Sequence, residues 1–269
     1  MSAATAKLDK VQKTLLITLY GKALDHRSRH PVLDDRHAHR VLRELGGAGV
    51  YGWSNVQDCY MAVLRAERMD RWAREFLTQH PDATVVQLAC GLDSRALRLD
   101  LPADVRWFDI DFPEVIALRQ QHLPAPDSGS YQLVSTSVTD SAWLEQLPAD
   151  APTLVIAEGL TMYLPEHEVW RLLSRITEHF PQGELLLDVL QPWAASFAGA
   201  FGYAMWGLAD PGDVERACPR LTLLENTSAL DGHQRVPHRA IRAYFGFLRR
   251  FPRLRDLIRP LRYRIEPRG

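Results

Sequence analysis

The sequence contains few of the features that mark specialised classes of protein. Its 269 residues include only three cysteines, Cys59, Cys90 and Cys218, and no CxxC pair, so neither a zinc module nor a thiol–disulfide motif is encoded. A reduced compartment is therefore expected. No run of about 18 apolar residues is present, and the N-terminus lacks the apolar stretch of a signal peptide. These absences predict a soluble, cytoplasmic protein.

An excess of charge of one sign is also missing. Lys and Arg together number 32, Asp and Glu number 33, and the formal net charge is −1. This balance gives no general electrostatic reason to expect nucleic acid or an anionic membrane as the main partner. It favours a small-molecule ligand instead. The arginine-rich stretch from Arg235 onward is interpreted as a solvated helix face rather than an anion-binding surface.

Several motifs of common enzyme classes are absent as well. The sequence has no GxGxxG phosphate loop and no GxSxG elbow, which argues against a nicotinamide oxidoreductase and against a serine hydrolase. A histidine-rich stretch runs from His26 to Arg40. Because His37 and His39 are two residues apart, they point to different faces of a helix, and we expect no metal site there.

The pattern of apolar residues changes along the chain. It predicts three helices, from Leu8 to Leu24, from about residue 34 to 45, and from Ser54 or Asn55 to Thr78. After Pro81, short apolar or β-branched runs alternate with helical segments, which is typical of βαβ units. The expected strands are TVVQLA, VRWFDI, YQLVST, TLVIAE, ELLLDVL, LTLLEN and LRYRIEP.

This order predicts one α/β domain with a Rossmann-like, doubly wound, mostly parallel seven-stranded sheet. We expect N-terminal helices over residues 1–80, a nucleoside-binding core over 81–190, a helical lid insertion over 191–220, and C-terminal strands and a helix over 221–269. The insertion is rich in aromatic residues, with Trp193, Phe197, Phe201, Tyr203 and Trp206. It is expected either to wall an acceptor pocket or simply to cover the sheet.

The residues that follow the strands carry the expected site, because ligands bind at the carboxyl ends of parallel strands. Ala89, Cys90 and Gly91 form a turn whose small side chains let a ligand approach. Asp111 ends the next strand about twenty residues later, where a carboxylate can accept both hydroxyls of a ribose. The alternative is that Asp111 only caps the helix beginning at Pro113. A ribose acid without a phosphate loop suits a phosphate-free nucleoside such as S-adenosylmethionine.

Longer runs carry a resemblance to a known family. The segments VVQLACGLDSRALRLD, WFDIDFPEVIALR and AEGLTMYLPEHEV, with TLLITLYGKALDHRSRHPVLDD near the N-terminus, resemble class I S-adenosylmethionine-dependent methyltransferases. More narrowly, they resemble the branch with leucine carboxyl methyltransferases and tetracenomycin-type polyketide O-methyltransferases. The resemblance extends from about Val11 to the closing YRIEP.

The resemblance implies a function as well as a fold. It implies S-adenosylmethionine as cofactor, S-adenosylhomocysteine as product, and methyl transfer to an oxygen of a small acceptor, a phenol or a carboxylate of the polyketide type. The alternatives are carboxyl methylation of a protein or peptide C-terminus and a non-catalytic binding subunit. A homodimer or a carrier-protein partner is compatible with the sequence, although no motif marks either.

The resemblance also assigns cofactor-binding residues. Arg65 matches an arginine that pairs with the methionine carboxylate of the cofactor. Asp111 matches the ribose acid, with Asp109 preceding it, and Glu158 matches an acid beside the cofactor after the fourth strand. Lys22, or its neighbour Tyr20, lies where an N-terminal helix closes over the cofactor.

Two positions depart from the family pattern. Ala89 stands beside Gly91 where relatives have a glycine, and its methyl group lies where backbone and cofactor are expected to meet. Ser137 stands where many relatives have an acid beside the adenine, so it brings a hydroxyl without charge. Val138 follows it and is assigned to the same side of the nucleoside.

The catalytic residues are less well defined, because methyl transfer mainly requires the acceptor oxygen, methyl carbon and sulfur to be aligned. A base is optional for a carboxylate, which is already ionised, but it helps a phenol. Asp188 closes the fifth strand at the correct end of the sheet and is the leading candidate base, ahead of Gln191 and His233. Tyr163, in the motif EGLTMYL, is assigned either to packing or to catalysis.

Overall fold

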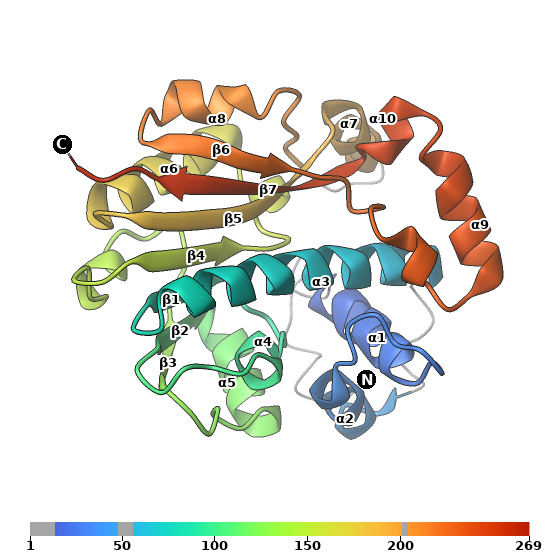
Figure 1. Ribbon diagram of the computed structural model, residues 1–269, viewed down its shortest axis with the longest axis horizontal. Helices are drawn as coiled ribbons and strands as arrows, with labels where there is room; N and C mark the ends of the chain where they lie inside the picture. Colours follow the sequence, from blue (N-terminus) through green and yellow to red (C-terminus); the bar gives the residue numbers. More distant parts are fainter. Residues whose placement is uncertain (1–13, 48–55, 201–203, 269) are drawn as a thin grey trace.

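A seven-stranded sheet forms the centre of the computed structural model, which describes residues 14–47, 56–200 and 204–268 (Figure 1). The strands are β1 (Thr84–Leu88), β2 (Arg106–Asp111), β3 (Ser130–Ser135), β4 (Thr153–Ala157), β5 (Gly183–Leu190), β6 (Leu221–Asn226) and β7 (Ile258–Ile265). Their order is β3-β2-β1-β4-β5-β7-β6. β7 pairs antiparallel with both β5 and β6, and the other strand pairs are parallel, so the predicted doubly wound, mostly parallel sheet is confirmed.

The central strands are continuous apolar runs because both faces of the sheet are covered. Every residue of β1 and of β4 is buried. β1 pairs in parallel with β2 on one side, where Val85 lies opposite Trp107, and with β4 on the other, where it lies opposite Leu154. The carboxyl ends of β1, β2, β4 and β5 therefore lie along one edge of the sheet.

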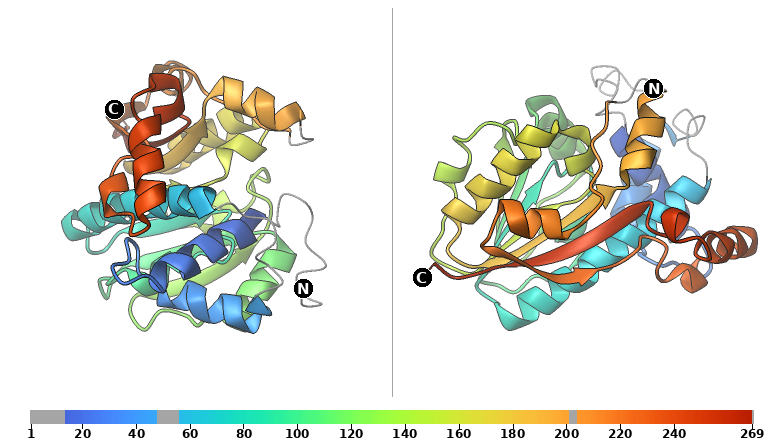
Figure 2. Two further views of the ribbon diagram at one scale, coloured as in Figure 1. Left: turned by 90° about the vertical axis from the view of Figure 1, so that its right-hand side faces the viewer. Right: turned by 90° about the horizontal axis from the view of Figure 1, so that it is seen from above.

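The helices are distributed over both faces and over this edge (Figures 1 and 2). They are α1 (Leu15–His26), α2 (Arg36–Glu44), α3 (Val56–Gln79), α4 (Arg95–Arg98), α5 (Pro113–His122), α6 (Glu166–His179), α7 (Pro192–Ala200), α8 (Gly212–Ala217), α9 (Arg239–Leu248) and α10 (Pro252–Arg255). Short 3-10 turns occur at Leu144–Gln146, Thr161–Tyr163 and His233–Arg235.

Different helices cover the two faces of the sheet. On one face, Trp72 and Phe76 of α3 pack against strand residues that include Val85. On the other face, Leu172 and Ile176 of α6 belong to the largest apolar cluster. This arrangement of helices on both sides of a sheet is the one that the alternation of strands and helices predicts.

The N-terminal helices cover the carboxyl edge of the sheet. α1 and α2 share an apolar cluster with Leu92, which lies just after β1, and with Val115 of α5. α1 also reaches the glycine turn, since a Cβ placed on Gly91 would lie 3.5 Å from Cβ of Leu15. These contacts position α1 as a cover over the turn after β1.

The predicted helix boundaries agree with the structure to within a few residues where they can be compared. The first helix begins at Leu15 within the described residues, and α3 ends at Gln79. Ser54 and Asn55, the expected caps of α3, lie outside the described residues, as do Phe201 and Tyr203 of the insertion. Within the described ranges, no helix combines the length and apolar character needed to cross a membrane.

The close approach of β4 and β5 gives a test of the fold. Gly183 has a φ of +150°, and a Cβ there would lie 1.9 Å from the carbonyl oxygen of Thr153. We expect Gly183→Ala to lower the free energy of unfolding by at least about 2 kcal/mol, because the backbone must move. Gly199→Ala is the matched control: nothing lies within 4 Å of its added Cβ, so α7 should gain about 0.5–1 kcal/mol. Equal urea midpoints for the two variants would contradict this.

Candidate active site

A strained turn follows β1 at the carboxyl edge of the sheet. Ala89 has a φ of +48° and Gly91 a φ of +53°, both in the left-handed region. This conformation costs a residue that carries a Cβ about 1–2 kcal/mol, so Ala89 occupies a position that favours glycine. The family departure predicted at Ala89 therefore has a structural cost, and the strain lies at the place where a ligand is expected.

Asp111 lies beside this turn and accepts hydrogen bonds from it. The backbone N–H of Gly91 donates to Oδ2 over 2.7 Å, and the backbone N–H of Phe112 donates to Oδ1 over 2.8 Å. Each oxygen keeps a further lone pair, which leaves room for two ligand hydroxyls. Burial raises the pKa of Asp111 to about 6. Phe112 is the N-cap of α5, and no side chain caps this helix, so the alternative role of Asp111 as its cap is not realised.

Asp109 has a different environment from Asp111. Its side chain is fully buried and accepts hydrogen bonds from Trp107 Nε1 (2.8 Å), the Tyr131 hydroxyl (2.6 Å) and Arg119 Nη2. Arg119 in turn donates to the carbonyl oxygens of Gly91 and Asp93. The Asp109 carboxylate is thus occupied by protein donors, and it holds the glycine turn through Arg119.

Arg65 of α3 reaches the ends of β4 and β5. Its Nε lies 3.1 Å from Oε1 of Glu158, and its Nη1 lies 2.8 Å from Oδ2 of Asp188. The other oxygen of Asp188 accepts the N–H of Gly159 over 2.6 Å. Gly159 packs on the guanidinium, since a Cβ there would lie 3.2 Å from Nη2 of Arg65. The structure therefore brings Arg65, Glu158 and Asp188 together.

Glu158 and Asp188 differ in their affinity for a proton. Burial alone would raise the pKa of Glu158, but Arg95 and Arg65 lower it to about 2. Burial raises the pKa of Asp188, and the neighbouring Arg65 only partly opposes this. Asp188 is also fully buried. Neither carboxylate offers an accessible oxygen that readily accepts a proton.

Arg95, at the start of α4, joins three segments of the chain. It is fully buried, its Nε lies 2.7 Å from Asp70 of α3, and its Nη2 lies 2.5 Å from the second oxygen of Glu158. Its Nη1 lies 3.3 Å from Asp93 in the turn after β1. One guanidinium thus holds together α3, the glycine turn and the end of β4.

Arg98, one turn further along α4, extends these ion pairs to the N-terminal helices. It pairs with Asp70 (2.6 Å), with Asp93 and with Asp35 (3.4 Å). Asp35 caps α2 by accepting the N–H of Ala38 over 2.9 Å. Lys22 of α1, buried as the cover predicts, lies 3.0 Å from Asp93.

Together these ion pairs form one buried cluster, which we call the charge cluster. Its cations are Lys22, Arg65, Arg95 and Arg98, and its carboxylates are Asp35, Asp70, Asp93, Glu158 and Asp188. A fifth cation, the exposed Arg74, lies 4.0 Å from Asp70, so five basic side chains face the five carboxylates. Carboxylates buried in this number are tolerated because each has a basic partner.

Ser137 and Val138 follow β3 at the same edge. The Ser137 hydroxyl lies 2.8 Å from the Thr139 hydroxyl, and it is half-buried. Val138 is buried in the main apolar cluster, and its carbonyl accepts Trp143 Nε1 over 3.2 Å. The Ser137 hydroxyl therefore lies at the carboxyl edge, whereas the Val138 side chain packs in the apolar cluster.

The remaining candidates are separated: Tyr163 and Gln191 lie near the end of β5, whereas His233 lies beside α9. Tyr163 is half-buried against an apolar cluster with Met162, Leu190 and α7. The Gln191 backbone N–H bonds to Leu257, and His233 lies against Gly246 of α9. The Tyr163 side chain is therefore positioned between the motif after β4 and the insertion.

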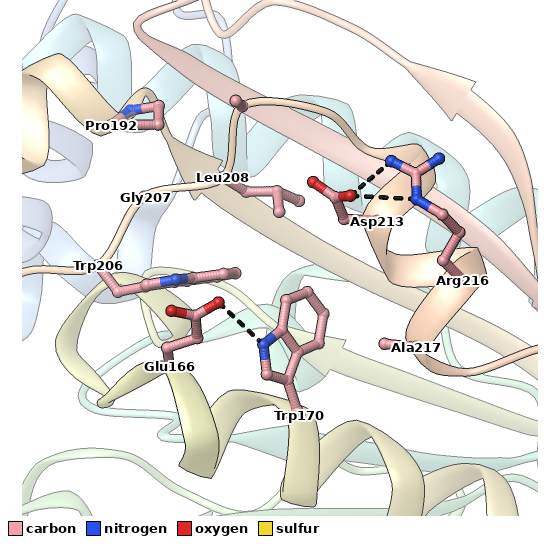
Figure 3. Close-up of a pocket in the computed structure, with 10 residues that line it drawn as sticks. Glu166, Trp170, Pro192, Trp206, Gly207, Leu208, Asp213, Arg216 and Ala217 are labelled. Atoms are coloured by element: carbon pink, nitrogen blue, oxygen red, sulfur yellow. Dashed lines mark hydrogen bonds and ion pairs between the residues drawn. The ribbon is translucent and has the colours of Figure 1, made fainter.

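A groove of about 640 Å³ borders the insertion on the α6–α8 side of the sheet (Figure 3). Trp170 and Trp206 meet edge to face in it, with ring centroids 5.5 Å apart. Glu166 and Asp213 line it, and Arg216 is already paired with Asp213 and with the nearby Asp210. Neither Asp111 nor any residue of the charge cluster lines this groove, so it is separate from the site at the carboxyl edge.

The charge cluster is the main feature that sequence reasoning missed. Asp93, Arg95 and Arg98 follow the glycine turn directly in LDSRALR. An acid and two arginines within a segment bounded by buried leucines indicate ion pairs that must be satisfied internally, which is the signal that could have found them. No group of three or more His, Cys, Asp or Glu side chains suited to a metal occurs among the residues that the structure describes.

Comparison with known proteins places this site in a family. The family model for leucine carboxyl methyltransferase matches residues 16–177. The chain belongs to the leucine carboxyl methyltransferase family. It is therefore an S-adenosylmethionine-dependent methyltransferase, and the predicted cofactor is confirmed.

Two relatives support the family assignment, and a more distant solved structure shares the fold. The chain is 39% identical over 96% of its length to the tetracenomycin polyketide synthesis O-methyltransferase TcmP of Streptomyces glaucescens, covering 98% of that protein. It is 35% identical over 88% of its length to the S-adenosyl-L-methionine-dependent methyltransferase dpfgK of Gibberella zeae, covering 90% of it. The N-methyltransferase NodS of Bradyrhizobium japonicum, solved with S-adenosyl-L-homocysteine, shares the fold with a TM-score of 0.51 at 14% identity, covering 86% of this chain and 99% of NodS.

The residues at the edge of the sheet fit the cofactor of this methyltransferase family. Asp111 keeps acceptor capacity for two ribose hydroxyls beside the glycine turn. Arg65, which the resemblance matches to the arginine for the methionine carboxylate of the cofactor, lies at the same edge, paired with Glu158 and Asp188.

Removing a cation from the charge cluster tests its energetic importance. We expect Arg95→Gln to lower the free energy of unfolding by about 3–5 kcal/mol, because Asp70, Asp93 and Glu158 lose a buried partner. Arg95→Lys should lose less, since it keeps the charge but not the planar fork. Arg106→Gln, at an exposed pair with Asp150, is the matched control and should change stability far less. Similar urea midpoints for Arg95→Gln and Arg106→Gln would count against the cluster.

The raised pKa of Asp111 predicts pH-dependent cofactor binding. The ionised carboxylate accepts the ribose hydroxyls, so affinity for S-adenosylhomocysteine should be constant above about pH 7. Below pH 6 it should fall, by up to about tenfold per pH unit, as Asp111 takes up a proton. Calorimetry between pH 5 and pH 8 measures this affinity.

The variant Asp111→Asn should bind S-adenosylhomocysteine at least about tenfold more weakly and lose the pH dependence, whereas the exposed control Asp150→Asn should match the wild type. Equal wild-type affinities across this range would refute the assignment.

Proposed function

We propose that this methyltransferase transfers the methyl group to a carboxylate oxygen of a small aromatic, polyketide-like acceptor. The observation that carries the proposal is that both carboxylates at the ends of β4 and β5 are occupied by arginines or backbone donors. The name of the family and the O-methyltransferase name of TcmP support the same reading.

The choice between a carboxylate and a phenol depends on the need for a base. A carboxylic acid is ionised near neutral pH, whereas a phenol with a pKa of about 10 benefits from proton removal. Glu158, with a pKa of about 2, does not take up a proton near neutral pH. Asp188 is buried and holds Arg65 and Gly159. These two residues therefore suit an acceptor that arrives without its proton.

Each residue at the edge has a role in this proposal. Asp111 holds the ribose, Arg65 holds the amino-acid carboxylate, and Glu158 provides negative potential near the cofactor. Asp188 is a positioning residue that orients Arg65, in place of the base role expected from the sequence. The bound cofactor supplies an electrophilic methyl group on its sulfonium sulfur.

The surrounding residues align the reaction and exclude water. Lys22 brings α1 over the turn at Gly91 through its ion pair with Asp93. Ser137 and Val138 border the base of the nucleoside, while Asp109 holds the turn through Arg119. Tyr163 lies between the motif after β4 and α7, where its hydroxyl could orient an acceptor oxygen. Alignment and exclusion of water account for much of the rate of a displacement reaction.

An acceptor that offers both groups tests the proposal within one molecule. With a hydroxynaphthoic acid and cofactor labelled in its methyl group, we expect the label in an ester, which mild alkali releases. The rate should be nearly flat from about pH 7 to pH 9, because no base titrates. Label that survives alkali, as in an ether, would instead show transfer to the phenol. Failure to bind S-adenosylhomocysteine would support the non-catalytic alternative.

A further inference from the structure

α9 has two apolar stripes, although a helix on the surface of a protein needs only one. Ile241, Phe245 and Leu248 form the first stripe and pack toward Val63 and Leu64 of α3. This stripe alone accounts for the attachment of α9 to the rest of the molecule. Any further apolar residues on the helix are not required for folding.

The second stripe faces solvent and consists of Tyr244, Phe247 and Phe251, which we call the aromatic stripe. Their exposed fractions are 43%, 52% and 46%. Tyr244 and Phe247 lie three residues apart on α9, and Phe251 follows in the extended N-cap of α10. The rings of Phe247 and Phe251 meet with centroids 5.1 Å apart. Exposed aromatic residues grouped in this way mark an interaction surface.

Arginines surround the aromatic stripe without acidic residues between them. From Val236 to Arg255 the sequence contains no Asp or Glu. Among the described residues, Arg239, Arg250 and Arg253 form no ion pair. The whole-chain charge of −1 conceals this surface, because acids elsewhere offset it. The partner of the stripe is therefore both anionic and able to accept aromatic rings.

The stripe lies at the same end of the molecule as the active site. α9 and α10 are at the right of Figure 1, the side toward which β4 points, and α9 projects from the body of the protein in the right view of Figure 2. Leu257 and Ile258, directly after α10, pack against Ala194 and Ala195 of α7. The aromatic stripe thus adjoins the insertion that borders the carboxyl edge.

We propose that the aromatic stripe and its arginines dock on an anionic lipid bilayer. A helix with aromatic residues flanked by arginines suits the boundary between headgroups and acyl chains. A symmetric second copy of the chain is disfavoured, because it would place Arg250 and Arg253 opposite like charges. A projecting helix inserts into a deformable surface more readily than into a rigid acidic protein, which would need a matching groove.

Docking would bring the carboxyl edge close to the membrane surface. The acceptor of the proposed function has apolar aromatic rings and one ionised carboxylate, so a docked methyltransferase would meet it at the boundary between the acyl chains and water. This consequence rests on the proposed function, but the docking itself does not. Binding to vesicles can therefore be measured without any methyl transfer.

Co-sedimentation of the full chain with vesicles tests the proposal. We expect binding to vesicles of equal parts phosphatidylglycerol and phosphatidylcholine, little binding to phosphatidylcholine alone, and release at about 0.5 M NaCl. Arg250→Gln combined with Arg253→Gln should weaken binding about tenfold or more. Phe247→Ser combined with Phe251→Ser should do the same by removing the inserted rings.

Matched controls separate docking from general charge and from folding. Arg106→Gln combined with Arg216→Gln removes two exposed, ion-paired arginines elsewhere and should leave vesicle binding unchanged. All variants should bind S-adenosylhomocysteine like the wild type, which distinguishes a failure of docking from a failure of the proposed function. If the wild type does not bind the anionic vesicles, the proposed docking on a bilayer is wrong and an acidic protein remains as the partner. If the phenylalanine variant binds the vesicles as tightly as the wild type, the proposal is wrong as well.

Discussion

The ion pairs of Arg95 are the constraint on which the rest of the site depends. A guanidinium with no exposed surface is tolerated only if carboxylates match its charge, and Asp70, Asp93 and Glu158 do so from α3, the glycine turn and the end of β4. Arg98 carries the same requirement to Asp35 at the start of α2. The N-terminal helices and the sheet therefore come together around charges that neither part can satisfy alone. A buried ion-pair network of this kind fixes the relative positions of the segments that it joins more than it adds to the free energy of unfolding.

This constraint also determines the electrostatics of the cofactor site. Because the arginines hold Glu158 ionised, negative potential persists at the end of β4 without a mobile proton. Asp111 stands apart from the cluster, and burial raises its pKa to about 6, so it takes up a proton in mildly acidic solution. The strained φ of Ala89 at the same turn agrees with a backbone shaped for a ligand rather than for stability.

The strands and the order of helices could be predicted from the sequence because continuous apolar runs and helical spacing reflect burial directly. LTLLEN, for example, coincides with β6. The positions of Asp111, Arg65 and Glu158 followed from where strands end and from the family resemblance. The roles of Asp109 and Asp188 could not be predicted in the same way, because they depend on partners distant in sequence, Arg119 and Arg65. The cluster around Arg98 depends on four segments at once, and no local pattern contains that information.

We infer that a phosphate-free nucleoside with an amino-acid tail binds between Asp111 and Arg65 at the edge of the charge cluster. A crystal structure with S-adenosylhomocysteine bound tests it most directly. The account predicts both ribose hydroxyls on the Asp111 carboxylate, the ligand carboxylate on Arg65, and Arg95 still joining Asp70 to Glu158. Density for the ligand at another part of the sheet, or a ribose held by other side chains, would contradict it.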